Sequence, residues 1–132
     1  MILVDSNVLI DVLSRDPVWF TWSAEQLDLY SLAGPLFINE VIYAEMAGHA
    51  TSETDLDNAL AGLGVALERL PKAAMYLAGK TFARYRKAGG VRTGVLADFF
   101  IGAHAETMGL PILTRDIRHY RIYFPKVALV TP

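Results

Sequence analysis

Short apolar runs separated by longer segments of helical periodicity are the feature that most constrains the fold of this chain. The expected strands lie at residues 2–4, 36–38, 65–70, 111–114 and 127–130. Most of these runs are apolar at every position, whereas a strand with one face in water alternates apolar and polar residues. Such strands, alternating with helices, form a parallel sheet that is covered on both faces. The pattern therefore predicts an α/β fold, a three-layer α/β/α sandwich with a central, mostly parallel sheet.

Signals at helix ends place the helices between these strands. Asn39 is the expected N-cap of one helix, Pro71 suits the first turn of another, and Gly109 suits the end of a third. The expected helices cover residues 8–13, 17–32, 40–47, 71–88 and 96–108. No linker-like stretch or internal repeat interrupts the sequence, so a single domain over residues 1–132 is expected.

Composition excludes several classes of protein. Hydrophobic residues make up 53% of the chain and charged residues 20%, which gives enough apolar side chain to exclude a disordered protein. The absence of cysteine excludes a disulfide scaffold and a thiolate metal site. No apolar run approaches the ~18 residues of a membrane span, and residues 1–5 lack the pattern of a signal peptide. A soluble cytoplasmic domain is expected.

The net charge of −2 hides a strong asymmetry between the two halves of the sequence. Residues 1–68 carry eleven acidic residues and one basic residue, whereas residues 69–132 carry eleven basic and three acidic residues. Such a division favours an anionic partner for the basic half and a use for the crowded acids of the other half. The alternative is that the two halves interleave in the fold and their charges mix.

Four acidic residues follow or flank the expected strands. Asp5 comes directly after the strand at residues 2–4, and Asp116 follows the strand that ends at Thr114. Glu45 lies in the helix after the second strand, and Asp98 lies in the first turn of the helix that begins near residue 96. Because the carboxyl ends of parallel strands share one edge of a sheet, these carboxylates are expected to meet there.

Clustered carboxylates repel one another and take up protons unless a cation neutralises them. Mg²⁺ or Mn²⁺ suits this environment, because hard divalent ions prefer oxygen ligands and keep water molecules for exchange. A bound ion of this kind polarises a phosphodiester and lowers the pKa of a water molecule, which is the chemistry of a nuclease. Asn7 and Thr114 are candidates for orienting the carboxylates through hydrogen bonds.

Each acid also has a purely structural interpretation. Asp5 is a potential helix N-cap, and acids in first helical turns, such as Asp98 and Glu40, interact favourably with the helix dipole. We assign Glu40 to that role alone. Glu45 lies among apolar residues of its helix and therefore needs a partner. Small residues one and two turns after Asp98, including Gly102, are expected to leave room beside it.

The chain resembles the PIN-domain ribonucleases, most closely the VapC-type toxins of prokaryotic toxin–antitoxin pairs. The matching segments are residues 2–7, 38–46, 97–105 and 113–116, in an order and spacing that cover essentially the whole chain. The resemblance implies a Mg²⁺-dependent endoribonuclease, a neutralising antitoxin and a homodimer. It implies that the catalytic and metal-binding residues are Asp5, Glu45, Asp98 and Asp116, supported by Asn7 and Thr114.

Basic residues close to these acids are candidates for binding the RNA backbone. Arg92 precedes Asp98, while Arg115 and Arg118 flank Asp116. Cationic side chains beside a metal site hold phosphates, so we assign these three arginines to RNA binding. Tyr120, like the other aromatic residues near it, is expected in the core instead of stacking on bases.

Other side chains receive no catalytic role. The histidines His49, His104 and His119 lack the spacing of a zinc site. The aromatic segment with Trp19, Phe20 and Trp22 is expected to be partly covered by a second copy of the chain or by an antitoxin.

Two alternative functions remain open from the sequence. A phosphohydrolase or phosphotransfer domain would use Asp5 as a nucleophile, but dehalogenase-like enzymes need a second Asp where this chain has Asn7. Receiver domains need a lysine after a late strand, where this chain has Arg115. The non-enzymatic alternative is an inactive RNA-binding domain of PIN type whose acids only cap helices.

Overall fold

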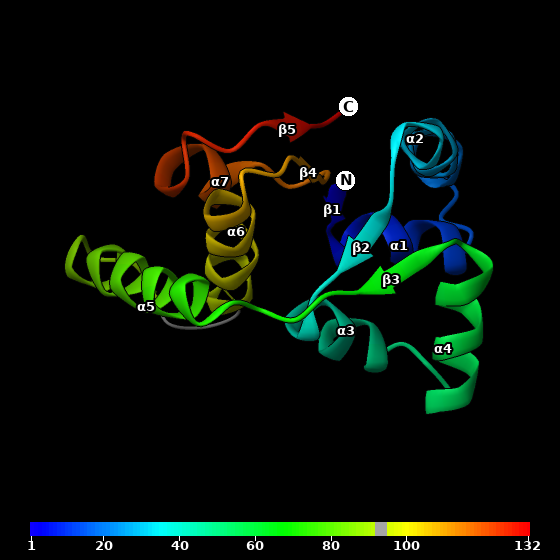
Figure 1. The fold of residues 1–132 in the computed structure, drawn as a ribbon, viewed down its shortest axis with the longest axis horizontal. Helices are drawn as coiled ribbons and strands as arrows, with labels where there is room; N and C mark the ends of the chain where they lie inside the picture. Colours follow the sequence, from blue (N-terminus) through cyan, green and yellow to red (C-terminus); the bar gives the residue numbers. More distant parts are fainter. Residues whose placement is uncertain (92–94) are drawn as a thin grey trace.

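A five-stranded sheet runs through the centre of the protein (Figure 1). The computed structural model describes residues 1–91 and 95–132. In chain order the strands are β1 (Ile2–Val4), β2 (Leu36–Ile38), β3 (Val65–Leu67), β4 (Ile112–Leu113) and β5 (Leu129–Val130). The strand order across the sheet is β3-β2-β1-β4-β5, and all four pairings are parallel. The predicted α/β class with a parallel sheet is confirmed.

Seven helices surround the sheet in the described ranges. They are α1 (Ser6–Leu13), α2 (Phe20–Ala33), α3 (Glu40–Ala47), α4 (Glu53–Gly62), α5 (Lys72–Lys87), α6 (Leu96–Met108) and α7 (Arg118–Tyr123). Figure 1 shows α5, α6 and α7 grouped at one end of the molecule and α2 and α4 at the other, with β1 and β4 between them. In the part of the chain that the structure describes, no helix has the length and apolar character to cross a membrane.

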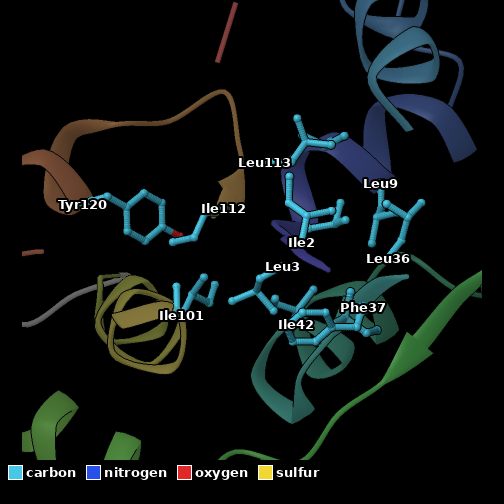
Figure 2. Close-up of a cluster of buried hydrophobic side chains, with 14 of the residues drawn as sticks. Ile2, Leu3, Leu9, Leu36, Phe37, Ile42, Ile101, Ile112, Leu113 and Tyr120 are labelled. Atoms are coloured by element: carbon cyan, nitrogen blue, oxygen red, sulfur yellow. The ribbon is translucent and has the colours of Figure 1, made fainter. Parts of the chain in front are cut away.

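Both faces of the sheet are apolar, as the continuous apolar runs predicted. Leu3 pairs with Phe37 on one side and with Ile112 on the other, so these three side chains share one face. Figure 2 shows that face against Ile42 of α3 and Ile101 of α6. The opposite face packs against α1 through a separate set of buried residues, which includes Ile2, Leu9 and Leu36. Helices therefore cover the sheet on both sides.

The chain adds strands to one side of β1 first and to the other side afterwards, so the order of strands reverses at the centre of the sheet. The chain builds outward from β1 to β2 and β3, then returns to place β4 on the other side of β1. In open α/β sheets, ligands bind outside the carboxyl ends of the strands at such a reversal. The first residues after β1 and β4, Asp5 and Thr114, therefore stand where this topology favours a site.

Several expected boundaries are confirmed at the level of individual caps. Asn39 accepts a hydrogen bond from the backbone N–H of Ile42 at 3.0 Å and caps α3. Gly109 ends α6 with a φ of 65°, a left-handed conformation that glycine adopts without strain. Pro71 precedes the first residue of α5.

Two helices were not predicted. Helix α4 begins after Ser52, whose side chain accepts from the backbone N–H of Asp55, and it buries only Leu56 and Leu60. Helix α7 lies where the sequence favoured the approach to a strand, and it buries only Tyr120. Both helices present so few apolar residues that helical periodicity gave little signal.

Candidate active site

Asp5 lies at the centre of the candidate site, between the end of β1 and the start of α1. It is almost completely buried, at 4% exposed. Its Oδ1 accepts a hydrogen bond from the backbone N–H of Ser6 at 2.8 Å, which caps α1. Its Oδ2 accepts hydrogen bonds from the hydroxyl groups of Thr114 and Tyr120, each at 2.8 Å. Asp5 is therefore both the helix cap considered from the sequence and the centre of a polar network.

Thr114 and Asn7 approach Asp5 from the neighbouring strand and from α1. Thr114 is completely buried, and its Oγ1 accepts a hydrogen bond from Nδ2 of Asn7 at 3.2 Å while donating to Asp5. Oδ1 of Asn7 accepts from the backbone N–H of Arg115 at 3.1 Å. The two residues expected to orient the acids are thus in contact with each other, and one of them binds Asp5 directly.

Glu45 reaches the same network from α3. Its Oε1 accepts a hydrogen bond from the hydroxyl of Ser6 at 3.1 Å. Glu45 is exposed on α3, yet its carboxylate has the polar partner that its apolar neighbours in the helix led us to expect. Glu40 instead accepts a hydrogen bond from the backbone N–H of Leu70 at 2.7 Å, so its carboxylate binds the segment that precedes α5.

Asp98 and Asp116 bind cationic or imidazole side chains of α7. Oδ2 of Asp98 lies 2.8 Å from Nδ1 of His119, and because a carboxylate only accepts, the imidazole is the donor. Asp116 forms a two-point ion pair with Arg118, at 3.0 and 2.8 Å. These contacts are partly exposed, with 27% of the Asp98 side chain and 40% of the Asp116 side chain accessible.

Burial and mutual repulsion raise the pKa of three of the four carboxyl groups. Burial raises the pKa of Asp5 to about 6, against the opposing hydrogen bonds from Thr114 and Tyr120 and together with repulsion from Asp98. The pKa of Glu45 is also raised, first by loss of water and then by the charge of Asp5. Loss of water likewise raises the pKa of Asp98, although His119 opposes the change. Repulsion between carboxylates thus adds to the effect of burial for Asp5 and Glu45.

The pKa of Asp116 is shifted in the opposite direction. Its hydrogen bonds from Arg118 hold the pKa of its carboxyl below the ordinary value. Repulsion from Asp116 nevertheless contributes to the raised pKa of Asp98. Asp5 and Asp116 follow the adjacent strands β1 and β4, Glu45 is bonded to Ser6, and Asp98 contacts α7. All four predicted acids therefore lie at one edge of the sheet.

The donor set of this cluster fits a hard divalent cation. It offers carboxylate oxygens, its acids destabilise one another as anions, and the side chains that orient Asp5 are neutral hydroxyl groups. Within residues 1–91 and 95–132, no three acidic or imidazole groups are arranged as ligands of a single ion. Two of the four carboxylates are bound instead to His119 and Arg118.

The room expected beside Asp98 is filled. A Cβ atom placed on Gly102 would overlap the ring of Phe124, which packs directly against that position of α6. Gly102 is therefore explained by close packing with the segment after α7 and not by space for a ligand. The prediction of room at this position is wrong.

The three arginines assigned to RNA binding have different surroundings. Arg118 is exposed, with 77% of its side chain accessible, and is paired with Asp116. Arg115 is only 27% accessible and forms an ion pair with Asp11. Arg92 lies outside the described residues.

Two residues of the site were not assigned a role from the sequence. His119 contacts Asp98, and Tyr120 is buried in the core as expected but also donates its hydroxyl to Asp5. Their position three and four residues after Asp116 was the available signal, and its meaning depended on the unpredicted helix α7. His104, by contrast, is buried against Asn39 and Phe37, and it makes no contact with the acids among those described.

The aromatic segment around α2 is largely covered by the chain itself. Trp19 and Trp22 are half-buried and pack edge to face, with ring centres 6.2 Å apart. The large apolar residues of α2 that remain exposed are Leu29 and Leu32, at 57% and 88%. Any second chain that covers this helix would meet these leucines more than the indole rings.

Comparison with known sequences finds one family. The sequence profile described as "PIN domain" matches residues 2–125. No curated protein is significantly similar to the chain in sequence.

Solved structures share the fold over the full length of the chain. A chain of VapBC2 from Rickettsia felis, bound to a DNA fragment from its promoter, has a TM-score of 0.74 and 14% identity, and covers 100% of this chain and 99% of its own. VapBC-1 from nontypeable Haemophilus influenzae gives a TM-score of 0.71 at 16% identity, with coverages of 99% and 98%. FitAcB from Neisseria gonorrhoeae gives 0.67 at 20% identity, with coverages of 100% and 98%.

Proposed function

Because this chain belongs to the PIN domain family, we propose that it is a Mg²⁺-dependent endoribonuclease that acts as the toxin of a toxin–antitoxin pair. The observation that carries the proposal is the position of the buried Asp5 and three further acids at the edge of the sheet where the strand order reverses. Three of these acids have raised pKa values in a partly exposed cluster, a combination typical of functional sites.

The residues proposed to hold the metal are the four acids themselves. Asp5 and Asp98 are the proposed direct ligands, and Glu45 and Asp116 complete or recruit the ion. A bound Mg²⁺ or Mn²⁺ supplies the chemistry of polarising a phosphodiester and lowering the pKa of water. Oδ1 of Asp5 accepts one hydrogen bond and Oδ2 accepts two, so Oδ1 keeps a lone pair for a ligand.

The other residues of the site orient the acids. Thr114 and Tyr120 fix the plane of the Asp5 carboxylate with their hydroxyl groups, and Asn7 fixes Thr114. Ser6 draws Glu45 toward the cluster. Preorganised partners of this kind hold ligands in place without rearrangement when substrate binds.

Of the two described arginines proposed to contact phosphate, Arg118 has the more accessible side chain. It stands beside Asp116 at the edge of the acidic cluster, where an RNA backbone would approach. Arg92 remains a proposed contact from the sequence alone. Arg115, which is bound to Asp11, is a weaker candidate for this role.

An antitoxin and a second copy of the chain are the proposed protein partners, and the cytoplasm is the proposed compartment. The similar structures are described as VapBC, FitAcB and toxin–antitoxin complexes, which supports a protein partner here. A groove of about 350 Å³ between α1, α3 and α4, lined by Ile10, Leu13, Met46 and Leu56 among others, offers an apolar surface to such a partner.

The phosphotransfer alternative is disfavoured by the residue two positions after Asp5. Dehalogenase-like enzymes, which use the first Asp as a nucleophile, need a second Asp there. This chain has Asn7, whose side chain is bound to Thr114 and to the backbone of Arg115. The second alternative, an inactive RNA-binding domain, differs from the proposal in a single measurable property, cleavage.

The test is cleavage of RNA by the purified protein, with the cut ends mapped by sequencing. We expect Mg²⁺-dependent cleavage by the wild type and a loss of at least about 1,000-fold in Asp5→Asn and Asp98→Asn, because each change removes a charged ligand. Asp28→Asn is the matched control, since Asp28 is exposed on α2. Full activity in Asp5→Asn contradicts the assignment, and RNA binding by the wild type without cleavage supports the inactive domain.

A further inference from the structure

An ion pair between Asp11 of α1 and Arg115 lies beside this site and is not used by the proposed chemistry. Nε of Arg115 lies 2.6 Å from Oδ2 of Asp11, and Nη2 lies 2.9 Å from Oδ1. Such a two-point pair fixes the orientation of the guanidinium group as well as its position. The Asp11 side chain is 3% exposed, so the pair is anchored in the interior.

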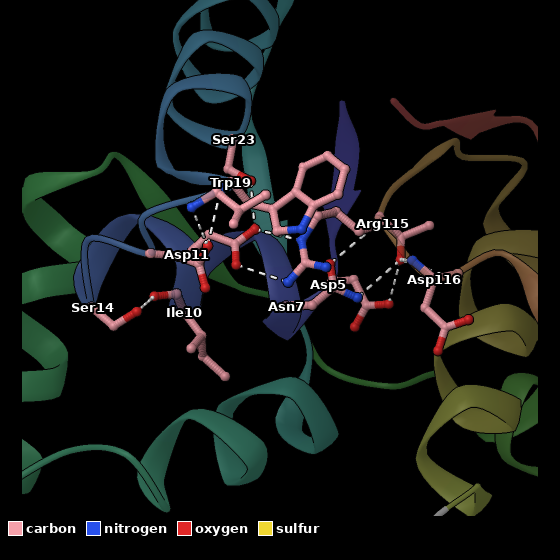
Figure 3. A network of polar contacts seen from close by, with 12 residues as sticks. Asp5, Asn7, Ile10, Asp11, Ser14, Trp19, Ser23, Arg115 and Asp116 are labelled. Atoms are coloured by element: carbon pink, nitrogen blue, oxygen red, sulfur yellow. Dashed lines mark hydrogen bonds and ion pairs between the residues drawn. The ribbon is translucent and has the colours of Figure 1, made fainter.

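Residues on both sides of the turn into α2 complete the surroundings of this pair. The hydroxyl of Ser23 donates to Oδ2 of Asp11 at 2.7 Å. The guanidinium carbon of Arg115 lies 4.9 Å from the ring centre of Trp19, a cation–π arrangement. Figure 3 shows Arg115 reaching across to Asp11 with the indole of Trp19 alongside. The guanidinium is therefore held between Asp11 and Trp19, and 27% of the Arg115 side chain remains accessible.

The backbone of Arg115 belongs to the turn that carries two residues of the site. Thr114, immediately before it, donates to Asp5, and Asp116, immediately after it, is the fourth acid. The N–H of Arg115 donates to Oδ1 of Asn7 at 3.1 Å. Residues 7 and 11 are four apart on a helix and so lie on the same face. Helix α1 thus holds this turn at two points. Asn7 binds the backbone N–H of Arg115, and Asp11 binds the side chain of Arg115.

We propose that Asp11 and Arg115 are positioning residues of the nuclease site, whose ion pair holds the turn of residues 114–116 so that Thr114 meets Asp5 and Asp116 faces Asp98. The proposal rests on the nuclease function proposed above. It assigns Arg115 to the interior and removes it from the residues that contact RNA phosphates. Neither residue touches substrate, and both act through the turn.

Two interpretations of Arg115 give opposite results when its partner is removed. A phosphate contact would be released by Asp11→Asn and would keep or increase RNA affinity. A positioning residue would lose its anchor, so Asp11→Asn and Arg115→Gln would have the same effect. Arg115→Lys separates them further, because a lysine keeps the charge but cannot make the two-point contact.

The first measurement is amide hydrogen exchange of the protein alone, without metal or RNA. In Asp11→Asn and Arg115→Gln we expect the backbone N–H groups of residues 115 and 116 to exchange at least about 10-fold faster than in the wild type. These groups donate to Asn7 and to Thr114, and the turn that carries them is no longer held. Amides of α6, such as that of Ala103, should exchange as in the wild type. Unchanged exchange at Arg115 and Asp116 in either folded variant overturns the proposal.

The second measurement is the kinetics of RNA cleavage at several salt concentrations. We expect kcat to fall about 10- to 100-fold in Asp11→Asn, Arg115→Gln and Arg115→Lys, the size of effect that a small misplacement of reacting groups produces. KM and the salt dependence of binding should remain those of the wild type. The double variant should be no worse than either single variant, because both remove one interaction. Lys72→Gln, at an exposed position of α5, is the charge-removal control.

The outcomes separate the two proposals. A flatter salt dependence in Arg115→Gln, restored by Arg115→Lys, identifies a phosphate contact and overturns the positioning role. A wild type that cleaves no RNA contradicts the nuclease function alone, and the exchange measurement then still decides whether the pair holds the turn. Wild-type kcat in a folded Asp11→Asn protein overturns the positioning role.

Discussion

Two buried aspartates, one just before α1 and one near its C-terminal end, have very different side-chain partners. Asp5 and Asp11 are 4% and 2% exposed. Asp11 is neutralised by the guanidinium of Arg115, whereas the side chains that bind Asp5 are the hydroxyl groups of Thr114 and Tyr120. Among the described residues, Asp5 has no cationic partner. A buried carboxylate without a cation is costly. We interpret the difference as one carboxylate committed to the fold and one kept for an external cation.

The largest expected consequence is the contribution of Asp5 to the pH dependence of stability. Its folded-state pKa of about 6 is above the ordinary value of 3.8. The folded protein therefore binds this proton more tightly than the unfolded chain, and the added stability is present below pH ~4 and lost as the pH rises through 6. The loss amounts to about 3 kcal/mol. Denaturant unfolding of the metal-free protein between pH 4 and 7 measures it, and Asp5→Asn should flatten the slope. An equal slope in Asp5→Asn contradicts the raised pKa.

Replacing each aspartate by asparagine at neutral pH should change the stability of the protein in different ways. Asp11→Asn should lower the free energy of unfolding by about 2–3 kcal/mol, because it leaves Arg115 partly buried without its counter-charge. Asp5→Asn should leave the metal-free protein unchanged or more stable, because it removes an uncompensated buried charge. The hydroxyl of Tyr120 can accept from the new amide, and that of Thr114 can donate to the backbone oxygen of Asp116. Equilibrium urea unfolding at pH 7 measures both. Destabilisation of equal size in the two variants would mean that Asp5 is also committed to the fold.

Arg118 gives the smallest expected effect on stability, because its pair with Asp116 is exposed. Arg118→Gln should change the free energy of unfolding by less than about 0.5 kcal/mol. It should weaken RNA binding a few-fold and reduce the salt slope by about one, because one phosphate contact is lost. Fluorescence anisotropy with a labelled RNA at several salt concentrations measures this, beside Lys72→Gln. An unchanged slope removes Arg118 from the RNA surface.

The sequence predicted the residues that topology alone brings together. Asp5 and Thr114 each follow a continuous apolar strand, and the ends of neighbouring parallel strands must meet. Asn39 was identifiable because N-capping depends on local contacts. These predictions needed only short-range chemistry and the class of the sheet.

The parts that the sequence did not predict depend on contacts between distant residues or on weakly apolar helices. The pair of Asp11 and Arg115 joins residues 104 positions apart, and the apolar neighbours of Asp11 in the sequence do not identify its partner. This pair also shows that the acidic and basic halves of the chain partly mix their charges. His119 was missed because α7 has only six residues and one buried side chain, Tyr120.

The most direct test of the account is calorimetric titration of Mg²⁺, or Mn²⁺, into the metal-free protein without RNA. We expect the wild type to bind the ion and Asp5→Asn to lose most of that affinity, while Asp28→Asn binds as the wild type does. In the wild type, a free-ion concentration of ten times the dissociation constant should raise the free energy of unfolding by about 1.4 kcal/mol. Equal binding by the wild type and Asp5→Asn, or no binding by the wild type, would contradict the claim that the cluster around Asp5 is kept for an external cation.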